Sequence, residues 1–449
     1  MIPILYKKVL ALVILILFVF TTLSGGGCTK KPQENIPAEE IFSTAPITTK
    51  VSEDLSNYQN KFTEFQDYSQ YLSDISSVNG LICYGNIALL NAGIVIEPKG
   101  DPEAAVNYTN MYVIDITSHK VIQIIKYDKE NGFKNVFPYG INDNWIVYEQ
   151  NDDDEFNPNF TFYVIDRKTN KTRKLIERRR ENDEFFTKGE VIPKNQGIWI
   201  QSPQGILWGD KFYFHIGISL DKVDEKGVLP GISDSIYEVN LNTGDIKKII
   251  HINEKYGGIV SFSVNDHYLA YTFAKRDFEK QMLVEDIYLY SFKDGKITKF
   301  TNSGVCERPV LTKDDWIIYQ SWLPEALSLD ITVFDKSMGK PAFESVIRPI
   351  NKETPVFKVV SEGYKTGFFP KCIDVSPSGR FILFDEPYRL LDRETNTLIT
   401  LKGLPKARLL SFANDTTLVY YWVMEKYNGR DWVNGLWIID INKLLQFVD

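Results

Sequence analysis

Apolar and polar residues alternate along most of this chain, and one short alternating pattern returns seven times after residue 75. Each copy is a run of apolar residues at every second position that closes on a polar residue and a turn. The copies are MYVID (111–115), FYVID (162–166), IYEVN (236–240), IYLYS (287–291), ITVFD (331–335), YRLLD (388–392) and LWIID (436–440). Alternation in short runs rich in Val, Ile, Tyr and Phe predicts a β-strand at each copy.

A second apolar and aromatic run lies upstream of each copy. These runs are LICY (81–84), WIVY (145–148), KFYF (211–214), YLAY (268–271), WIIY (316–319), FILF (381–384) and LVYY (418–421). Turn-forming pairs such as Asn265-Asp266 and Asn414-Asp415 precede most of them. Helical patterning is almost absent after residue 75, so the sequence predicts an all-β fold built from repeated strand pairs.

Most repeats recur after about 50 residues, close to the roughly 40 to 50 residues of a four-stranded propeller blade. The segment Ile373-Asp-Val-Ser-Pro-Ser-Gly-Arg-Phe-Ile-Leu-Phe resembles the repeat signature of TolB-type and WD40-like β-propellers. This resemblance extends over about residues 75–447 and implies a seven-bladed β-propeller of four-stranded antiparallel blades at 79–449. Each blade would bury its aromatic strands against its neighbours. Propellers serve many unrelated functions, so the resemblance implies a fold and no reaction.

The N-terminus has the layout of a secretory signal. Lys7 and Lys8 precede an unbroken apolar run at 9–20, followed by Thr-Thr-Leu-Ser-Gly-Gly-Gly and Cys28. This segment resembles a bacterial lipoprotein signal, which implies a signal peptide at 1–27 and a lipid on the Cys28 thiol. The alternative is an uncleaved anchor. The apolar stretch 9–23 would form a helix of about 22 Å, shorter than the roughly 30 Å hydrocarbon core. Both interpretations place the rest of the chain outside the cytoplasm, in the cell envelope.

Residues 28–50 are polar, contain several Pro and Thr residues, and show no period, which predicts a flexible tether. Residues 51–78 have aromatic residues at spacings of three and four, so a short helix packed on the ring is the first interpretation. The last repeat ends without a hairpin turn, which leaves an alternative. A strand from 44–78 would then supply the outer edge of the last blade and close the ring.

Three cysteines remain after processing: Cys83, Cys306 and Cys372. Cys306 and Cys372 fall in equivalent strands of adjacent repeats, but one residue out of register. A one-residue offset points side chains to opposite faces of a strand, so we expect no disulfide between them. Both are expected to behave as small buried apolar residues.

Loop lengths differ between the two faces of the predicted disc. Turns between the first and second and between the third and fourth strands are short and share one face. The other face, here called the long-loop face, carries the long connections, at 91–110, 149–159, 177–197, 217–235, 274–286, 347–370 and 424–435. Long loops on a rigid scaffold commonly carry binding sites. The candidate partner-binding residues in or beside these loops are Phe156, Phe278, Trp322, Tyr427 and Trp432, with Arg178, Arg179, Arg180, Arg276 and Arg430 among them. The alternative is that these side chains only hold the loops in place.

Sequence motifs for chemistry are scarce. The acidic run 152–155 lacks the spaced ligands of a calcium loop, so we interpret it as a solvated turn. The four histidines show no metal-ligand spacing, and there is no Gly-x-Ser-x-Gly elbow or phosphate loop. We therefore assign no catalytic, cofactor or metal residues. The net charge of −8 and the absence of a basic stripe disfavour nucleic acid as a partner.

The sequence therefore predicts a lipid-anchored, extracytoplasmic propeller that binds an envelope protein or glycan through its long-loop face. No feature sets an oligomeric state. The alternative is a propeller-fold glycan lyase or hydrolase, in which Glu307, Asp374 and His251 would converge at the channel mouth. A purely structural spacer, with a featureless long-loop face, is a third possibility.

Overall fold

In the computed structural model the chain forms two compact units, Met1–Ile41 and Phe42–Asp449. The structure describes residues of the second part only, namely 47–52, 54, 63–68, 70–72, 75–96, 106–152, 154, 157–193, 196–280, 282–322, 343–351, 357–360, 371–385, 388–402, 409–425 and 432–448. The lipidation residue Cys28, the signal peptide and most of the tether therefore lie outside the described residues.

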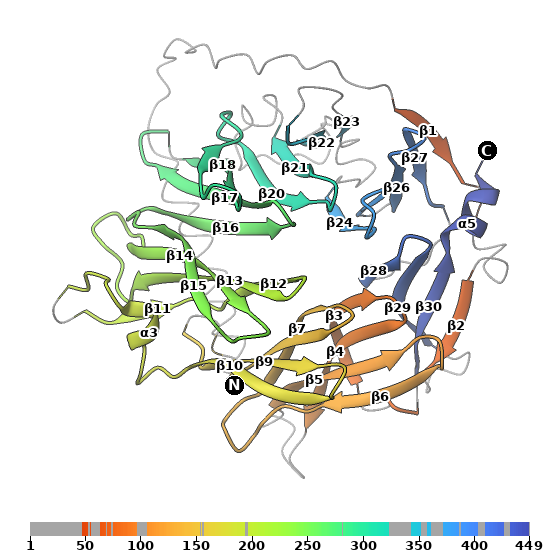
Figure 1. Ribbon diagram of the computed structural model, residues 1–449, viewed down its shortest axis with the longest axis horizontal. Helices are drawn as coiled ribbons and strands as arrows, with labels where there is room; N and C mark the ends of the chain where they lie inside the picture. The colour runs from red at the N-terminus through yellow and green to blue at the C-terminus, as the bar shows by residue number, and fades with distance from the viewer. Residues whose placement is uncertain are drawn as a thin grey trace, which may run out of the picture. The chain divides into compact units, whose positions relative to one another are not determined.

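The described chain forms a seven-bladed β-propeller of four-stranded antiparallel sheets, as the sequence predicts (Figure 1). Blade 1 contains β3 (Ile75–Tyr84), β4 (Ile87–Ile96), β5 (Val106–Asp115) and β6 (Lys120–Ile125). Blade 2 contains β7 (Asn135–Ile141), β8 (Trp145–Asn151), β9 (Phe160–Asp166) and β10 (Lys171–Arg178). In blade 3 the inner strand is divided into β11 (Ile198–Ile200) and β12 (Gln204–Trp208), followed by β13 (Lys211–Leu220), β14 (Gly231–Asn240) and β15 (Ile246–Ile252).

The remaining blades complete the ring. Blade 4 contains β16 (Gly257–Val264), β17 (Tyr268–Asp277), β18 (Met282–Ser291) and β19 (Ile297–Lys299). Blade 5 contains β20 (Cys306–Leu311), β21 (Trp316–Trp322), β22 (Phe343–Pro349) and β23 (Phe357–Val360). Blade 6 contains β24 (Cys372–Val375), β25 (Phe381–Phe384), β26 (Arg389–Asp392) and β27 (Thr397–Thr400). Blade 7 contains β28 (Leu409–Asn414), β29 (Thr417–Glu425) and β30 (Trp432–Asp440), and its fourth strand comes from the other end of the chain.

The N-terminal strand β2 (Thr63–Asp67) is this fourth strand, and it pairs antiparallel with β30 from Thr63↔Ile439 to Asp67↔Gly435. The ring-closing alternative is thus what the structure shows, and the helix preferred for this region is wrong over Thr63–Asp67. Strand β1 (Thr48–Val51) adds to the outer edge of blade 6, parallel to β27. The spacing of three and four residues suggested a helix, but it has another cause. Tyr68 and Leu72 are fully buried and follow β2 in a turn that packs between blades 7 and 1.

The Asp or Asn that ends several of the repeated runs accepts hydrogen bonds from the turn that follows it. In blade 2, Asp166 Oδ1 accepts the backbone N–H groups of Lys168 and Thr169 at 2.8 and 3.2 Å. In blade 3, Asn240 Oδ1 does the same for the two residues that start its turn, at 2.9 and 3.2 Å. Such Asx turns satisfy backbone donors where the chain leaves the third strand.

Two strand assignments from the sequence need correction. The run LICY forms the end of β3, the innermost strand of blade 1, whereas in the other blades the equivalent run belongs to the second strand. The run ITVFD at 331–335 was predicted to pair with WIIY, but β21 pairs with Phe343–Pro349 instead. Residues 331–335 lie outside the described residues. A strand pattern in the sequence does not show which of two neighbouring runs pairs with the second strand of the blade.

The core consists of seven hydrophobic clusters, each shared by two adjacent blades. Between blades 2 and 3, for example, Phe160, Phe162, Phe212 and Phe214 pack with ring centroids 5.0 to 5.9 Å apart. This confirms the prediction that the repeated aromatic strands pack between blades. Fully burying one such side chain stabilises the fold by about 1.5–3 kcal/mol.

No disulfide joins the described cysteines Cys83, Cys306 and Cys372, which agrees with the prediction of no bond between Cys306 and Cys372. Cys306 is fully buried, but Cys372 is only partly buried. Within the described residues, no helix is long and apolar enough to cross a membrane.

Candidate functional site

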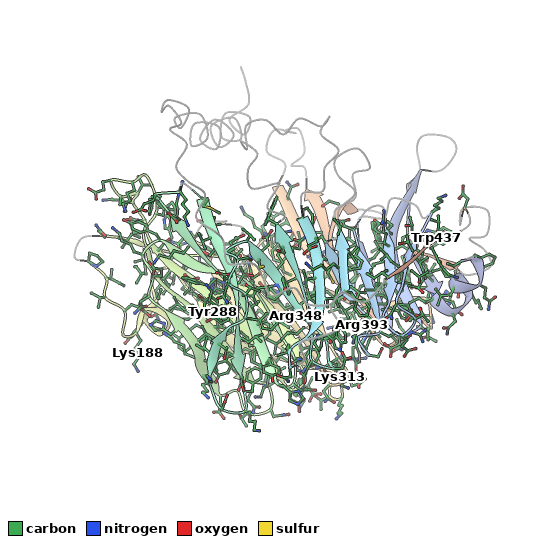
Figure 2. The ribbon with its side chains drawn as sticks, turned by 90° about the horizontal axis from the view of Figure 1, so that it is seen from above. Lys188, Tyr288, Lys313, Arg348, Arg393 and Trp437 are labelled. Carbon is green, nitrogen blue, oxygen red and sulfur yellow. The ribbon has the colours of Figure 1, made fainter. Side chains whose placement is uncertain are left out.

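The short-turn face is fastened by bonds between the turns of neighbouring blades. Asn142 Nδ2 in blade 2 donates to the Gly209 carbonyl in blade 3 at 2.7 Å. Trp208 Nε1 in blade 3 donates to Asp266 Oδ1 in blade 4 at 2.8 Å, and Asn265 Nδ2 donates to Asp315 Oδ1 in blade 5 at 2.9 Å. Figure 2 shows Lys313, from the β20–β21 turn, at the lower edge of the ring. Several polar side chains of this face therefore form hydrogen bonds that hold neighbouring blades together.

The long-loop face is built by strands that run further than the sequence suggested. Strands β13 and β14 stay paired out to Ser219↔Gly231, and β17 and β18 out to Asp277↔Met282. The connection expected at 274–286 is therefore mostly paired strand, whereas the one at 217–235 keeps a loop at 221–230 between its paired ends. A paired hairpin holds the residues at its tip in fixed positions.

The structure describes only two candidate partner-binding side chains. Phe156 and Tyr427 lie outside the described residues, and of Trp432 only the backbone is described, as the first residue of β30. Trp322 ends β21, and its ring centroid is 5.7 Å from that of Phe343. Phe278 lies at the tip of the β17–β18 hairpin. The two described side chains belong to different blades, Trp322 to blade 5 and Phe278 to blade 4.

Phe278 belongs to a group that we call the blade 3–4 patch, formed by Lys226, Tyr256, Arg276 and Phe278. The rings of Tyr256 and Phe278 meet edge to face at 4.8 Å. Lys226 Nζ lies 4.6 Å from the Tyr256 centroid and 4.1 Å from that of Phe278, and the Arg276 guanidinium lies 5.7 Å from Phe278. Tyr256 also donates to Asp224 at 2.6 Å, a bond that lowers the pKa of this carboxyl to about 2. Aromatic rings and cations are thus gathered where three connections meet.

The arginines of blade 2 hold loops in place. Arg178 is fully buried, and its guanidinium bonds Asp183 at 2.7 Å and Asn157 Oδ1 at 2.6 Å. Arg180 pairs with Asp152 and Asp154, both at 2.8 Å. The acidic run is therefore pinned by an arginine and by its own turn. Among the described residues, no group of three or more His, Cys, Asp or Glu side chains could hold a metal ion.

The three residues suggested for catalysis do not converge. His251 lies on the outer strand β15, where Nδ1 is 3.0 Å from Ser235 Oγ, whereas Glu307 and Asp374 lie on the innermost strands β20 and β24. Asp374 Oδ2 accepts the backbone N–H of Phe412 at 2.7 Å, which fastens blade 6 to blade 7. The same link recurs at equivalent positions, where Ser263 Oγ accepts Leu311 N at 2.9 Å and Ser411 Oγ accepts Cys83 N at 3.1 Å. Burial raises the pKa of Asp374 to about 6, but its contacts give it a structural role.

Glu307 lies beside an unusual stretch of β20. A β-bulge follows it, and Arg308 has a positive φ of 56°, which is strained for a residue other than glycine. Arg308 Nε lies 3.4 Å from Glu307 Oε2. Across the blade 4–5 boundary, burial and the charge of Glu307 raise the pKa of Glu285 to about 7. Sequence reasoning missed Glu285, which precedes the IYLYS run.

A second buried carboxyl lies between blades 2 and 3. Glu149 is fully buried, and its Oε2 lies 2.5 Å from the Tyr139 hydroxyl, which is also 2.8 Å from the Pro203 carbonyl. Asn151 Nδ2 donates to Glu149 Oε1 at 2.8 Å. Burial raises the pKa of Glu149 to about 7.

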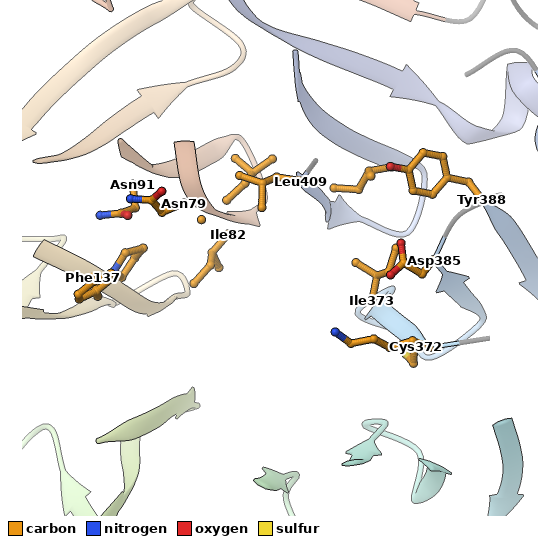
Figure 3. A pocket seen from close by; sticks show the side chains of 14 residues that line it. Asn79, Ile82, Asn91, Phe137, Cys372, Ile373, Asp385, Tyr388 and Leu409 are labelled. Atoms are coloured by element: carbon orange, nitrogen blue, oxygen red, sulfur yellow. The ribbon is translucent and has the colours of Figure 1, made fainter. Parts of the chain in front are cut away.

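A cavity of about 430 Å³ opens in the channel wall between blades 6, 7, 1 and 2 (Figure 3). Figure 3 shows Asn79 and Asn91 close together on one wall, with Asp385 and Tyr388 on the opposite wall. Asp385 follows β25, at the end of this strand that meets the long-loop face. The cavity, here called the channel pocket, therefore lies on the long-loop side of the channel.

No family model and no curated protein matches this sequence. Among solved structures, the β-propeller domain of the Trilobed protease from Pyrococcus furiosus is 12% identical with a TM-score of 0.48, covering 82% of this chain and 93% of that chain. An oligogalacturonate lyase in complex with manganese is 12% identical with a TM-score of 0.47, covering 84% of this chain and 96% of that chain. A polysaccharide lyase, Uly1, is 10% identical with a TM-score of 0.46, covering 85% and 98%. At these identities the similarity is one of fold alone.

The channel pocket was not predicted from the sequence. Asn91 lies between Leu90 and Ala92 in an otherwise apolar strand, and a polar residue in such a strand is the signal that could have marked it; Asn79, which follows Ser76 and Ser77 in its strand, has no such signal. Their meeting with Asp385 depends on ring closure, because blades 6 and 1 are brought together only when the ring is complete.

Proposed function

We propose that this protein is a lipid-anchored, extracytoplasmic propeller that binds an envelope protein or glycan through its long-loop face. The observation that supports this most directly is the difference between the two faces. The short turns bond to one another across blade boundaries, whereas the long-loop face presents hairpin tips and the blade 3–4 patch.

The blade 3–4 patch has the composition of a binding surface. Tyr, Phe and Arg are enriched at protein interfaces, and aromatic rings also pack against the apolar faces of sugars. Tyr256 and Phe278 are half-buried and Lys226 is exposed, so the group is held by its own contacts and still reaches solvent. A side chain fixed before binding loses less conformational entropy when a partner arrives.

The anchoring part of the proposal rests on the sequence. Lys7, Lys8, the apolar run and the glycines before Cys28 support lipidation at Cys28 and an envelope location. A propeller carried on a tether of about 20 residues would stay close to the membrane surface, within reach of envelope proteins and glycans.

A second candidate function is a glycan lyase or hydrolase. It is favoured by the pairing of Glu285 with Glu307 beside Arg308 on the long-loop half of the ring. Two carboxyl groups, one kept protonated near neutral pH, are the usual groups for glycoside chemistry. The variant Glu307→Gln would abolish such activity on envelope polysaccharide and leave partner capture by the blade 3–4 patch unchanged.

The leading proposal is tested by crosslinking and pull-down from intact cells that carry the full chain. We expect a partner captured by the native protein to be lost with Phe278→Ser. Phe292→Ser is the matched control, because Phe292 is also half-buried and lies near a lysine, 5.7 Å from Lys211 Nζ, but at the short-turn end of the same blade. Equal capture by both variants, or no capture by the native protein, would contradict the proposal.

A further inference from the structure

The channel pocket is a built site shared by four blades. Inner strands β3, β7, β24 and β28 all contribute to its lining, and its volume of about 430 Å³ falls within the range of small-molecule sites, roughly 300–1,000 Å³. Its walls combine apolar side chains such as Ile82 and Phe137 with a few polar ones. A few polar groups on an apolar lining are what orient a small ligand.

The side-chain oxygen of Asn91 is an unusual polar group in this lining. Asn91 is 1% exposed, its Nδ2 donates to the Val136 carbonyl, and its Oδ1 has no hydrogen-bond partner. Because the carbonyl can only accept, the amide must turn its Nδ2 toward it, and Oδ1 is the atom left over. A buried acceptor without a partner costs about 1–3 kcal/mol, so the group calls for a donor that the chain does not supply.

The charges of the pocket balance one another. Lys371 and Asp385 lie on facing positions of the β24–β25 hairpin, where Asp385 N donates to the Lys371 carbonyl at 3.0 Å. With one charge of each sign, the lining gives no net electrostatic attraction to a charged ligand. A purely apolar ligand would leave Asn91 Oδ1 unpaired and would desolvate both charges, which is unfavourable.

We propose that the channel pocket binds a neutral saccharide unit, with a sugar hydroxyl donating to Asn91 Oδ1 and Asn79 bonding a neighbouring hydroxyl. A sugar ring offers hydroxyl donors and acceptors around its edge and C–H faces that pack on side chains such as Phe137. Asn91 Oδ1 is covered by the surrounding side chains, so a small rotation of the amide accompanies binding. This goes further than the proposed function, because the pocket takes a sugar whether or not the blade 3–4 patch captures a protein.

The test is isothermal titration calorimetry of the folded chain with three probe sets. These are neutral disaccharides (cellobiose, maltose and chitobiose), a disaccharide of uronic acids, and an uncharged tripeptide. We expect binding of at least one neutral disaccharide and tenfold or greater weakening with Asn91→Leu. Asn79→Ala should lower the affinity for the same sugar at least threefold. Since Asn79 is exposed, this variant keeps the fold even if Asn91→Leu does not.

One control checks that the effect is specific to the pocket. Asn242→Ala changes an exposed asparagine on the short-turn face, and it should bind the sugar as the native chain does. Sugar binding that is lost with Phe278→Ser and kept in both pocket variants would place the sugar on the blade 3–4 patch and overturn the inference. Binding of the tripeptide or the uronic acid disaccharide in preference to all neutral sugars would overturn the inference, as would no binding of any neutral sugar. Unchanged affinity in both pocket variants would also overturn it. None of these results depends on whether a protein partner is captured.

Discussion

The buried environment of Glu149 predicts how the free energy of unfolding depends on pH. The Tyr139 hydroxyl has one proton but two acceptors within reach, Glu149 Oε2 at 2.5 Å and the Pro203 carbonyl at 2.8 Å. If Glu149 is ionised, one of these acceptors must go without a proton. If Glu149 is protonated, its own O–H donates to Tyr139, and Tyr139 donates to Pro203. Burial therefore favours the neutral acid and raises the pKa of Glu149 to about 7, although the bonds from Tyr139 and Asn151 favour the charged form.

The size of the effect follows from the shift. A change in the pKa of Glu149 from 4.5 to about 7 corresponds to roughly 3 kcal/mol between its two protonation states. The folded chain holds this proton more tightly than the unfolded chain. The resulting stabilisation is therefore fully present below pH 4.5 and is lost as pH rises through about 7. The variant Glu149→Gln is neutral at every pH, so it should be within about 1 kcal/mol of the native protein at pH 5 and exceed it by up to about 3 kcal/mol at pH 8.

The assay is urea unfolding of both proteins at pH 5, 6, 7 and 8. Glu177→Gln is the control of opposite sign, because Lys174 and Arg179 lower the pKa of Glu177, so its charged form stabilises the fold at neutral pH. That variant should be no more stable than the native chain at pH 8. Native and Glu149→Gln stabilities that stay parallel from pH 5 to 8 would show that Glu149 is not a buried neutral acid.

Three further predictions concern the ring, its loops and its anchor. Tyr68→Ala should lower the free energy of unfolding by about 3–5 kcal/mol in denaturant titrations, because the fully buried ring packs beside the closing strand; a loss below 1 kcal/mol would show that this seam is not critical. Arg178→Ala should lower the free energy of unfolding by about 3–5 kcal/mol, because it leaves Asp183 unpaired, and it should speed proteolysis at 152–159. Arg178→Lys should not restore stability, because lysine cannot make the paired bonds of the guanidinium. Cys28→Ala should abolish incorporation of labelled fatty acid without changing the melting temperature, and labelling that persists would refute lipidation.

The sequence predicted the propeller because the property that repeats, alternation within short runs, is the one that builds blades. It also predicted the packing of runs such as WIVY and FILF between blades. Pairing choices were harder. The runs at 331–335 and at Phe343–Pro349 both suit a strand, and only contacts with β21 decide between them. The closing strand Thr63–Asp67 was left as an alternative to a helix, because its partner β30 is almost the whole chain away.

The site was predictable only in outline. Phe278 could be placed on the long-loop face because its loop connects the second and third strands of a blade. Its neighbours could not be foreseen, since Lys226 and Tyr256 come from two other connections. Asp374 illustrates the opposite error. A carboxyl on an innermost strand suggested catalysis, but the carboxyl binds the Phe412 amide of the next blade.

Closure of the ring by β2 has a consequence for the order in which the molecule assembles. Strand β2 is synthesised before any blade, yet its pairing partner β30 is nearly the last segment to emerge. During translation the N-terminal strand must therefore remain unpaired while the blades form beside one another. Pairings this distant in sequence make folding slow, because a long loop must close before they gain any energy. Ring closure is thus expected to be the final and slowest folding event, leaving an interval in which chaperones or proteases act on the open seam between blades 7 and 1.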